Sequence, residues 1–102
     1  MSTNKSIKGT QTERNLVIAY MAESSAYTRY TFYAAQANKE SYFPVERVFT
    51  ETAENELRHA KVFFKFLEGG NVEVPLGVDA GVIGETASNL ATAAHEELVE
   101  GV

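Results

Sequence analysis

A mostly apolar stripe with the spacing of a helix face runs through residues 44–68. It constrains the fold of this chain more than any other feature, because two ionisable side chains stand in its middle. With about 100° of rotation per residue and Glu56 as the origin, the stripe lies within about 80° on either side. Glu56 and His59 lie one turn apart on it. An unpaired buried charge costs on the order of several kcal/mol, and one metal ion bound by both groups would offset that cost. The stripe consists of Val45, Val48, Phe49, Thr52, Ala53, Ala60, Phe63, Phe66 and Leu67.

A second stripe surrounds Glu23 and predicts a helix over residues 11–38. Thr10 and Glu13 have the spacing of a capping box, which marks the start of this helix. Pro44 is typical of a first helical position, so we expect the next helix over residues 44–68, ending at the Gly69-Gly70 pair. The second stripe consists of Leu16, Ala19, Tyr20, Ala26, Tyr27, Tyr30, Ala34 and Ala37.

The connection between these two helices is short, which makes them antiparallel neighbours. Glu23 precedes the connection by about as many residues as Glu56 and His59 follow it. At roughly 1.5 Å of rise per residue, the three side chains should therefore meet at the same depth.

We expect residues 69–84 to form a long connection whose apolar residues lie along the protein surface. A third helix is predicted over residues 85–102. Glu97 stands seven residues after Leu90, as Glu23 stands seven after Leu16, and Glu96 should be more exposed. No segment reads as a convincing strand. The predicted inner face of the third helix comprises Leu90, Ala93, Ala94, Glu97 and Glu100.

The predicted fold class is all-α: a single ferritin-like domain over residues 1–102, with two long antiparallel helices, a crossover and the start of a third helix. Ferritin-like di-iron bundles use one Glu from each of two helices and a Glu-x-x-His pair from each of two others. Here one Glu, one Glu-x-x-His and one Glu-x-x-Glu are present, and the second Glu-x-x-His is missing.

Bulk composition narrows the classes of function. The 9 basic and 14 acidic residues give a net charge of −5, which argues against nucleic acid or an anionic membrane as partner. The sequence has no cysteine, which excludes a disulfide framework, a thiolate zinc site and an iron–sulfur cluster within these residues. No apolar run has membrane-spanning length and no signal-peptide core is present, so a cytoplasmic location is expected.

From Ile7 to Glu100 the sequence resembles the N-terminal part of rubrerythrin, a non-haem di-iron peroxidase with a ferritin-like bundle. The family's fourth helix and its C-terminal rubredoxin domain have no counterpart in these residues. The stretches that carry the resemblance are residues 8–13, Asn15-Leu16, Glu23-Ser24, Arg29-Tyr30, residues 51–56, His59-Ala60-Lys61, residues 64–70, residues 80–83 and Asn89-Leu90.

This resemblance implies two iron ions as cofactors, with manganese or zinc as substitutes, and places Tyr30 beside the site as a catalytic residue. The other tyrosines of the first helix are expected to pack. Ala94-His95-Glu96 departs from the family's Gly-Glu context, which weakens the assignment on the third helix. The implied iron ligands are Glu23, Glu56, His59, Glu97 and Glu100.

The expected function is the reduction of hydrogen peroxide to water in oxidative-stress defence, with electrons from an external carrier such as a rubredoxin. A ferritin-type role in iron oxidation or storage is the first alternative. A helical assembly module with a vestigial metal site is the second.

Two and a half helices cannot enclose such a site, so we expect the four-helix bundle to be completed by another chain. Ile18, Met21 and Phe32 form a second apolar surface opposite Glu23. A homodimer or higher oligomer, an exchange of helices between chains, or a separate fragment carrying helix four would cover the exposed surfaces. A helix that stops just after its ligand positions also suggests a cleaved or fragmentary chain.

Overall fold

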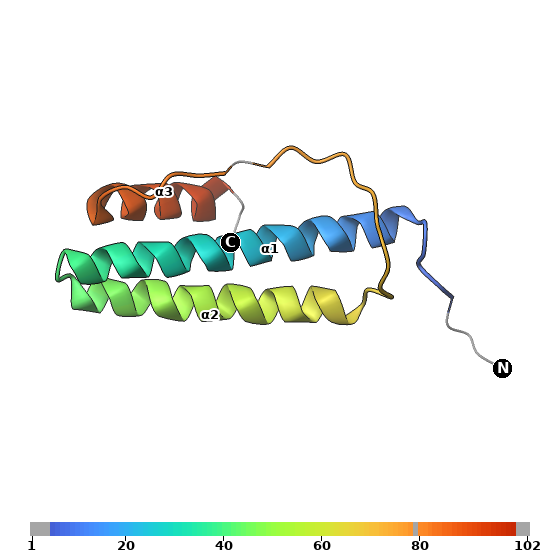
Figure 1. Ribbon diagram of the computed structural model, residues 1–102, viewed down its shortest axis with the longest axis horizontal. Helices are drawn as coiled ribbons and strands as arrows, with labels where there is room; N and C mark the ends of the chain where they lie inside the picture. Colours follow the sequence, from blue (N-terminus) through green and yellow to red (C-terminus); the bar gives the residue numbers. More distant parts are fainter. Residues whose placement is uncertain (1–4, 79, 100–102) are drawn as a thin grey trace.

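The fold is a helical hairpin with a third helix laid against one of its arms. The computed structural model describes residues 5–78 and 80–99. It contains α1 (Gln11–Lys39), α2 (Phe43–Lys65) and α3 (Thr86–Val99), and the described ranges include no strand. Figure 1 shows α1 and α2 side by side and antiparallel, with α3 beside α1. The predicted all-α architecture is confirmed.

The start of α1 is fixed by a capping arrangement close to the predicted one. The Thr10 hydroxyl accepts a hydrogen bond from the Glu13 amide at 3.2 Å. The Glu13 carboxylate accepts a hydrogen bond from the Gly9 amide at 2.9 Å. In a capping box it would accept from the amide of the N-cap residue, which is Thr10. Lys8 pairs with Glu13 at 2.9 Å and donates to the carbonyl of Gly69 at 2.7 Å. The first turn of α1 is thereby tied to the segment that follows α2.

The boundaries of α2 differ slightly from those expected. The helix begins at Phe43, one residue before Pro44, and ends at Lys65 rather than at residue 68. Phe66 closes the last turn with a hydrogen bond to the carbonyl of Phe63 at 3.1 Å. Gly69 and Gly70 then have φ of 86° and 83°, a left-handed conformation that glycine adopts without steric cost. The glycine pair therefore turns the chain a few residues after the helix has ended and does not itself end the helix.

The core lies toward the α1–α2 turn. The rings of Tyr33 and Phe49 are 5.2 Å apart, and Tyr30 packs edge-on against Tyr33 at 5.7 Å. Small side chains beside these rings let the helices approach closely. The buried cluster consists of Tyr30, Tyr33, Ala34, Ala37, Phe49, Ala53 and Ala93.

The flanks of α2 are open. Val48 and Phe66, predicted to be buried, are 55% and 63% exposed, so that prediction is wrong for the chain by itself. On the opposite flank Leu57 and Phe64 are also exposed. No described element packs over either flank, because α2 has contacts only with α1. The sequence stripe was wider than the surface that one neighbouring helix can cover.

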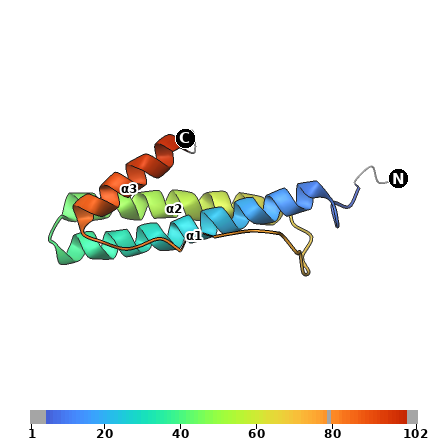
Figure 2. The same ribbon diagram turned by 90° about the horizontal axis from the view of Figure 1, so that it is seen from above.

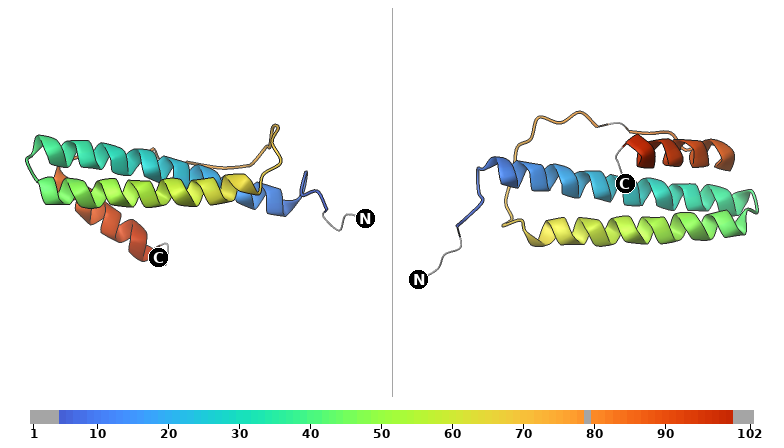
Figure 3. Two further views of the ribbon diagram at one scale, coloured as in Figure 1. Left: turned by 90° about the horizontal axis from the view of Figure 1, so that it is seen from below. Right: turned by 180° about the vertical axis from the view of Figure 1, so that it is seen from behind.

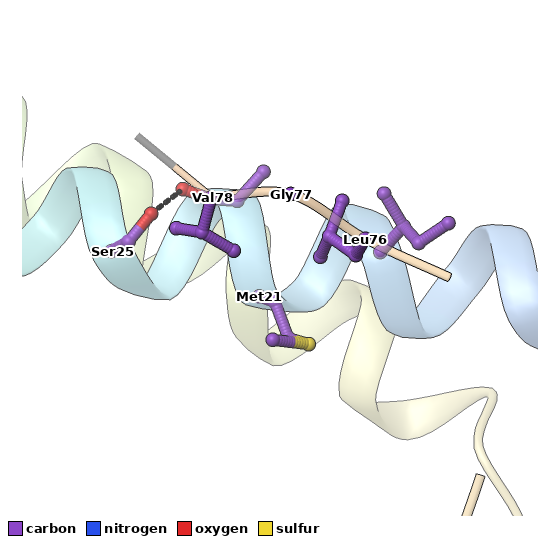
Figure 4. A pocket seen from close by; sticks show the side chains of 7 residues that line it. Met21, Ser25, Leu76, Gly77 and Val78 are labelled. Atoms are coloured by element: carbon purple, nitrogen blue, oxygen red, sulfur yellow. Dashed lines mark hydrogen bonds between the residues drawn. The ribbon is translucent and has the colours of Figure 1, made fainter. Parts of the chain in front are cut away.

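The connection from α2 to α3 returns along the outer side of α1, as expected for its apolar residues. Figures 1 and 3 show it running beside α1 before it enters α3. Between α1 and the connection lies an apolar groove of about 260 Å³ (Figure 4). Met21, Leu76 and Val78 line it together with Ile18, Ala22, Ser25 and Gly77.

The third helix rests on α1 through a face that shares Ala93 with the predicted one but is otherwise turned away from it. Thr86, Asn89 and Ala93 are buried, whereas Leu90 is 41% exposed and Ala94 is also exposed. Figure 2 shows α3 crossing the hairpin obliquely. None of the described helices combines the length and the apolarity needed to cross a bilayer.

Candidate metal centre

Three side chains from the two long helices converge halfway along the hairpin. Glu23 comes from α1, and Glu56 and His59 come from successive turns of α2. His59 Nδ1 lies 3.5 Å from an oxygen of Glu23 and 4.0 Å from an oxygen of Glu56. One ligand atom from each residue lies within 4.8 Å of the other two. This is the meeting at one depth that the two sequence stripes predict.

The surroundings of the two carboxylates favour a bound cation. The side chains of Glu23 and Glu56 are 25% and 16% exposed, so most of their surface is removed from water. Glu23 Oε2 is buried and accepts no hydrogen bond, although His59 Nδ1 lies 3.5 Å from it. A buried acceptor without a partner loses its hydration without compensation. A metal ion at the convergence point would satisfy this oxygen and offset the repulsion between the two carboxylates.

His59 completes the group from the open side. Its side chain is 57% exposed, and the adjacent flank of α2, which carries Leu57, is also open. Two carboxylates and one imidazole, with no sulfur, form a donor set that suits iron or manganese in an oxygen-rich, near-octahedral geometry. Zinc also accepts these donor types. The three donors leave further coordination positions free for other ligands, and the residues present therefore fit a metal ion.

The remaining predicted site residues are not all placed. Tyr30 is buried, and its ring packs against Tyr33 and Phe49 within the core cluster. It follows Glu23 by two helical turns, roughly 10 Å along the axis of α1. Glu97 stands near the end of α3, where side chains lie outside the described part, and Glu100 lies outside the described residues altogether.

Sequence reasoning missed one ion pair next to the core. Arg29 Nη2 of α1 and Glu96 Oε2 of α3 lie 2.6 Å apart, with their side chains 18% and 26% exposed. Glu96 was expected to be the more exposed neighbour of Glu97. The helical period of residues 86–99 alone could not reveal the pair, because Arg29 lies outside the stripe around Glu23.

Glu40 anchors the beginning of α3 to the end of α1. Its Oε2 accepts hydrogen bonds from the Thr86 amide at 2.8 Å, the Thr86 hydroxyl at 2.7 Å and the Gln36 amide at 2.9 Å. These bonds, the Thr86 hydroxyl first among them, lower the pKa of Glu40 below its usual value of 4.5. A carboxylate at the first turn of α3 also interacts favourably with the helix dipole.

The apolar groove of Figure 4 is not part of this centre. Its seven lining residues include no ionisable side chain and belong to the outer side of α1 and the connection. Glu23, Glu56 and His59 all lie on the α1–α2 side. The groove therefore offers shape and apolar surface, whereas the group of Glu23, Glu56 and His59 offers donor atoms for a metal ion.

Comparison with known proteins gives one consistent family. A protein-family model described as rubrerythrin matches residues 14–100. The chain is 54% identical to a rubrerythrin of Porphyromonas gingivalis over 94 residues, covering 92% of this chain and 47% of that protein. It is 42% identical to a rubrerythrin of Nitratidesulfovibrio vulgaris, covering 94% of this chain and 52% of that protein. A rubrerythrin-1 of Clostridium acetobutylicum is 45% identical, with 91% and 50% covered. The chain thus spans about half the length of these relatives.

Proposed function

The chain belongs to the rubrerythrin family, and from that premise we propose that it forms a di-iron site that reduces hydrogen peroxide to water in oxidative-stress defence. The observation that carries the proposal is the convergence of Glu23, Glu56 and His59 around a buried carboxylate oxygen that accepts no hydrogen bond. The resemblance in sequence supports it over most of the chain. We propose the cytoplasm as its compartment.

Each proposed ligand has a distinct part in this site. Glu23 and Glu56 supply negative charge that offsets the repulsion between two cations, and His59 supplies a neutral nitrogen donor. Glu97 and Glu100 are the proposed further ligands from α3. Two iron(II) ions held by these groups would supply the two electrons that, together with two protons from the solvent, convert hydrogen peroxide into two molecules of water. Manganese or zinc would occupy the same donors as substitutes.

Tyr30 is the proposed catalytic residue beside the ligands. Its ring belongs to the buried cluster, so its hydroxyl is held in a fixed place with little freedom to move. A phenol both donates and accepts hydrogen bonds, which suits it to orient a ligand carboxylate or the oxidant.

Electrons must come from outside this segment of chain. Its 102 residues include no cysteine with which to hold a redox-active iron in a rubredoxin-type site. We therefore propose an external donor such as a rubredoxin. Such a carrier would deliver electrons one at a time to the di-iron site after each turnover.

We propose that a second copy of the chain closes the site. The flank next to His59 exposes Leu57 and Phe64, and Tyr20 lines a hollow of about 390 Å³ there. Two hairpins related by a two-fold axis would cover this flank and form a four-helix bundle. Symmetry would then supply a second Glu23, Glu56 and His59, which restores the two Glu and two Glu-x-x-His groups. Exchange of helices between chains, or a fragment carrying helix four, would serve the same purpose.

The test loads the protein with iron(II) without oxygen and mixes it with hydrogen peroxide or dioxygen. We expect two irons per assembled site. Stopped-flow absorbance should show that hydrogen peroxide oxidises the bound iron(II) faster than dioxygen does. Preference for dioxygen with many irons retained per chain would indicate the ferritin-type role instead. Failure to bind two metals per assembled bundle would indicate a vestigial site in a helical assembly module.

Light scattering on the loaded protein measures its oligomeric state, and a stable monomer with two irons would contradict the second-copy proposal.

A further inference from the structure

The face by which α3 contacts α1 is polar at both ends. Thr86, Asn89 and Ala93 are the buried residues of α3, at 2%, 1% and 9% exposure. Their spacing of three and four residues leads on to Glu96, the partner of Arg29. Leu90, the largest apolar residue on the first two turns, is left 41% exposed. Ala93 is the apolar side chain through which α3 joins the buried cluster, so apolar burial contributes little to the rotation of α3 about its own axis.

Two polar anchors set that rotation instead. At the first turn Glu40 holds the amide and hydroxyl of Thr86. Ten residues later Glu96 meets Arg29 at 2.6 Å, and both side chains are largely buried. Arg29 Nε is buried without a hydrogen-bond partner, and the pair between Nη2 and Glu96 offsets the charge of this largely buried guanidinium. Loss of either charge would leave the other in a partly dry place and free the far end of α3.

The side of α3 that carries Thr92, His95 and Glu96 faces the connection. These residues line a cavity of about 380 Å³ together with Gly81 and Val82 of the connection and with Arg29 and Tyr33 of α1. The connection runs along the outer side of α1, away from α2 (Figures 1 and 2). The burial of the Tyr33 hydroxyl at this junction, together with the nearby Glu96, raises the pKa of Tyr33.

Position 97 lies on the other side of the helix. At about 100° per residue, it stands about 140° from position 92 and about 160° from position 95. It shares a face with position 90, seven residues before it. The connection lies on the side of positions 92 and 95, so the face that positions 90 and 97 share is the one opposite the connection, and Leu90 on that face is 41% exposed.

We propose that Arg29 is a positioning residue for the metal centre, acting through Glu96: the ion pair fixes the rotation of α3 and so delivers Glu97 to the metal. The two adjacent glutamates then have separate tasks, since Glu96 orients the helix and Glu97 binds the metal. This inference rests on the proposed function, because it assigns the delivery of a ligand. It also makes a structural claim that can be measured without metal.

The metal-free measurement uses the absence of cysteine from the chain. Glu54→Cys on α2 and Ala91→Cys on α3, both at exposed positions, accept nitroxide labels whose separation reports the orientation of α3. We expect one narrow distance distribution with the pair intact and a broad one in Glu96→Gln or Arg29→Gln. The exchanged pair, Arg29→Glu with Glu96→Arg, should restore the narrow distribution. Equal widths in all four proteins would overturn the proposal.

The second measurement counts metal in the same full-length variants. If iron is bound as proposed, Glu96→Gln and Arg29→Gln should each lower the affinity for the more weakly held iron by about tenfold or more. The exchanged pair should restore that affinity. Glu97→Gln should lose the same iron with the distance distribution unchanged, and the exchange should not rescue it. Normal iron content in Glu96→Gln would overturn the positioning role. If the unmodified protein binds no metal, the proposed function fails, and the label distances still decide the role of the ion pair.

Discussion

The two interfaces that α1 forms are built from different kinds of contact. Against α2 it packs aromatic rings and small side chains, with Tyr30 and Tyr33 of α1 around Phe49. Against α3 it uses the Arg29–Glu96 pair and the bonds between Glu40 and Thr86. The first contact is stabilised by burial, which is roughly proportional to apolar area and insensitive to direction. The second depends on a few directed bonds, so the loss of one charged partner should affect the placement of α3 more than the loss of one methyl group affects the first.

The largest effect should come from the apolar interface. Phe49 is 2% exposed, and Phe49→Ala removes the ring on which both tyrosines pack. We expect a loss of about 3–5 kcal/mol in the free energy of unfolding, measured by urea denaturation. Val82→Ala in the connection, where the side chain is 81% exposed, should change stability by no more than about 0.5 kcal/mol. Similar losses in the two variants would mean that the aromatic cluster is not the core.

This difference between the interfaces also explains which features of the structure could be predicted from the sequence. The start of α1 at Gln11 and the convergence of Glu23 with Glu56 and His59 follow from apolar period and a short turn, both local properties. The end of α2 was placed three residues too late, because the Gly69-Gly70 pair stands beyond the last turn rather than at it. Local patterns thus sufficed for the hairpin to within a turn.

The rest of the molecule depends on partners that are distant in sequence. Val48 and Phe66 belong to the stripe of α2, yet no described element covers them. On α3, Leu90 carried the predicted inner face, whereas the structure buries Asn89, whose side-chain amide bonds both the amide and the carbonyl of Gly84 at 2.9 Å. A hydropathy pattern treats Asn89 as an outward residue. It has no means of registering a buried polar group whose bonds are satisfied.

The next effect should come from removal of a proposed metal ligand, which tests the function assigned to the α1–α2 interface. Glu56→Ala or His59→Ala should abolish binding at one metal position, as measured by elemental analysis of the loaded protein. Glu54→Ala is the matched control, because position 54 lies about 160° from Glu56 on the helix and is exposed. Equal loss of metal in all three variants would contradict the assignment of the site.

A smaller effect is expected at the α1–α3 interface as the pH falls. The bonds from Thr86 lower the pKa of Glu40 below 4.5, so the ionised form is favoured in the folded state. The stabilisation is complete above about pH 4.5 and is lost as the pH falls through the lowered pKa of Glu40. Helical circular dichroism, followed downward from pH 5, should therefore fall by less in Glu40→Gln than in the unmodified protein. Glu54→Gln should behave like the unmodified protein, and an equal fall in Glu40→Gln would assign the whole transition to other carboxylates.

The smallest change is a single hydroxyl, and it separates packing from catalysis within the apolar interface. Tyr30→Phe keeps the ring that packs against Tyr33 and Phe49, so the fold should be retained with a stability change of about 1 kcal/mol or less. Metal loading should be unchanged, because no proposed ligand is altered. The rate of the peroxide reaction should nevertheless change, since only the hydroxyl can hydrogen-bond a ligand carboxylate or the oxidant. The matched variant is Tyr27→Phe, one turn earlier and half-buried, which should react at the normal rate. If both variants react normally, Tyr30 serves only to pack the core, and the apolar interface contributes position but no chemistry.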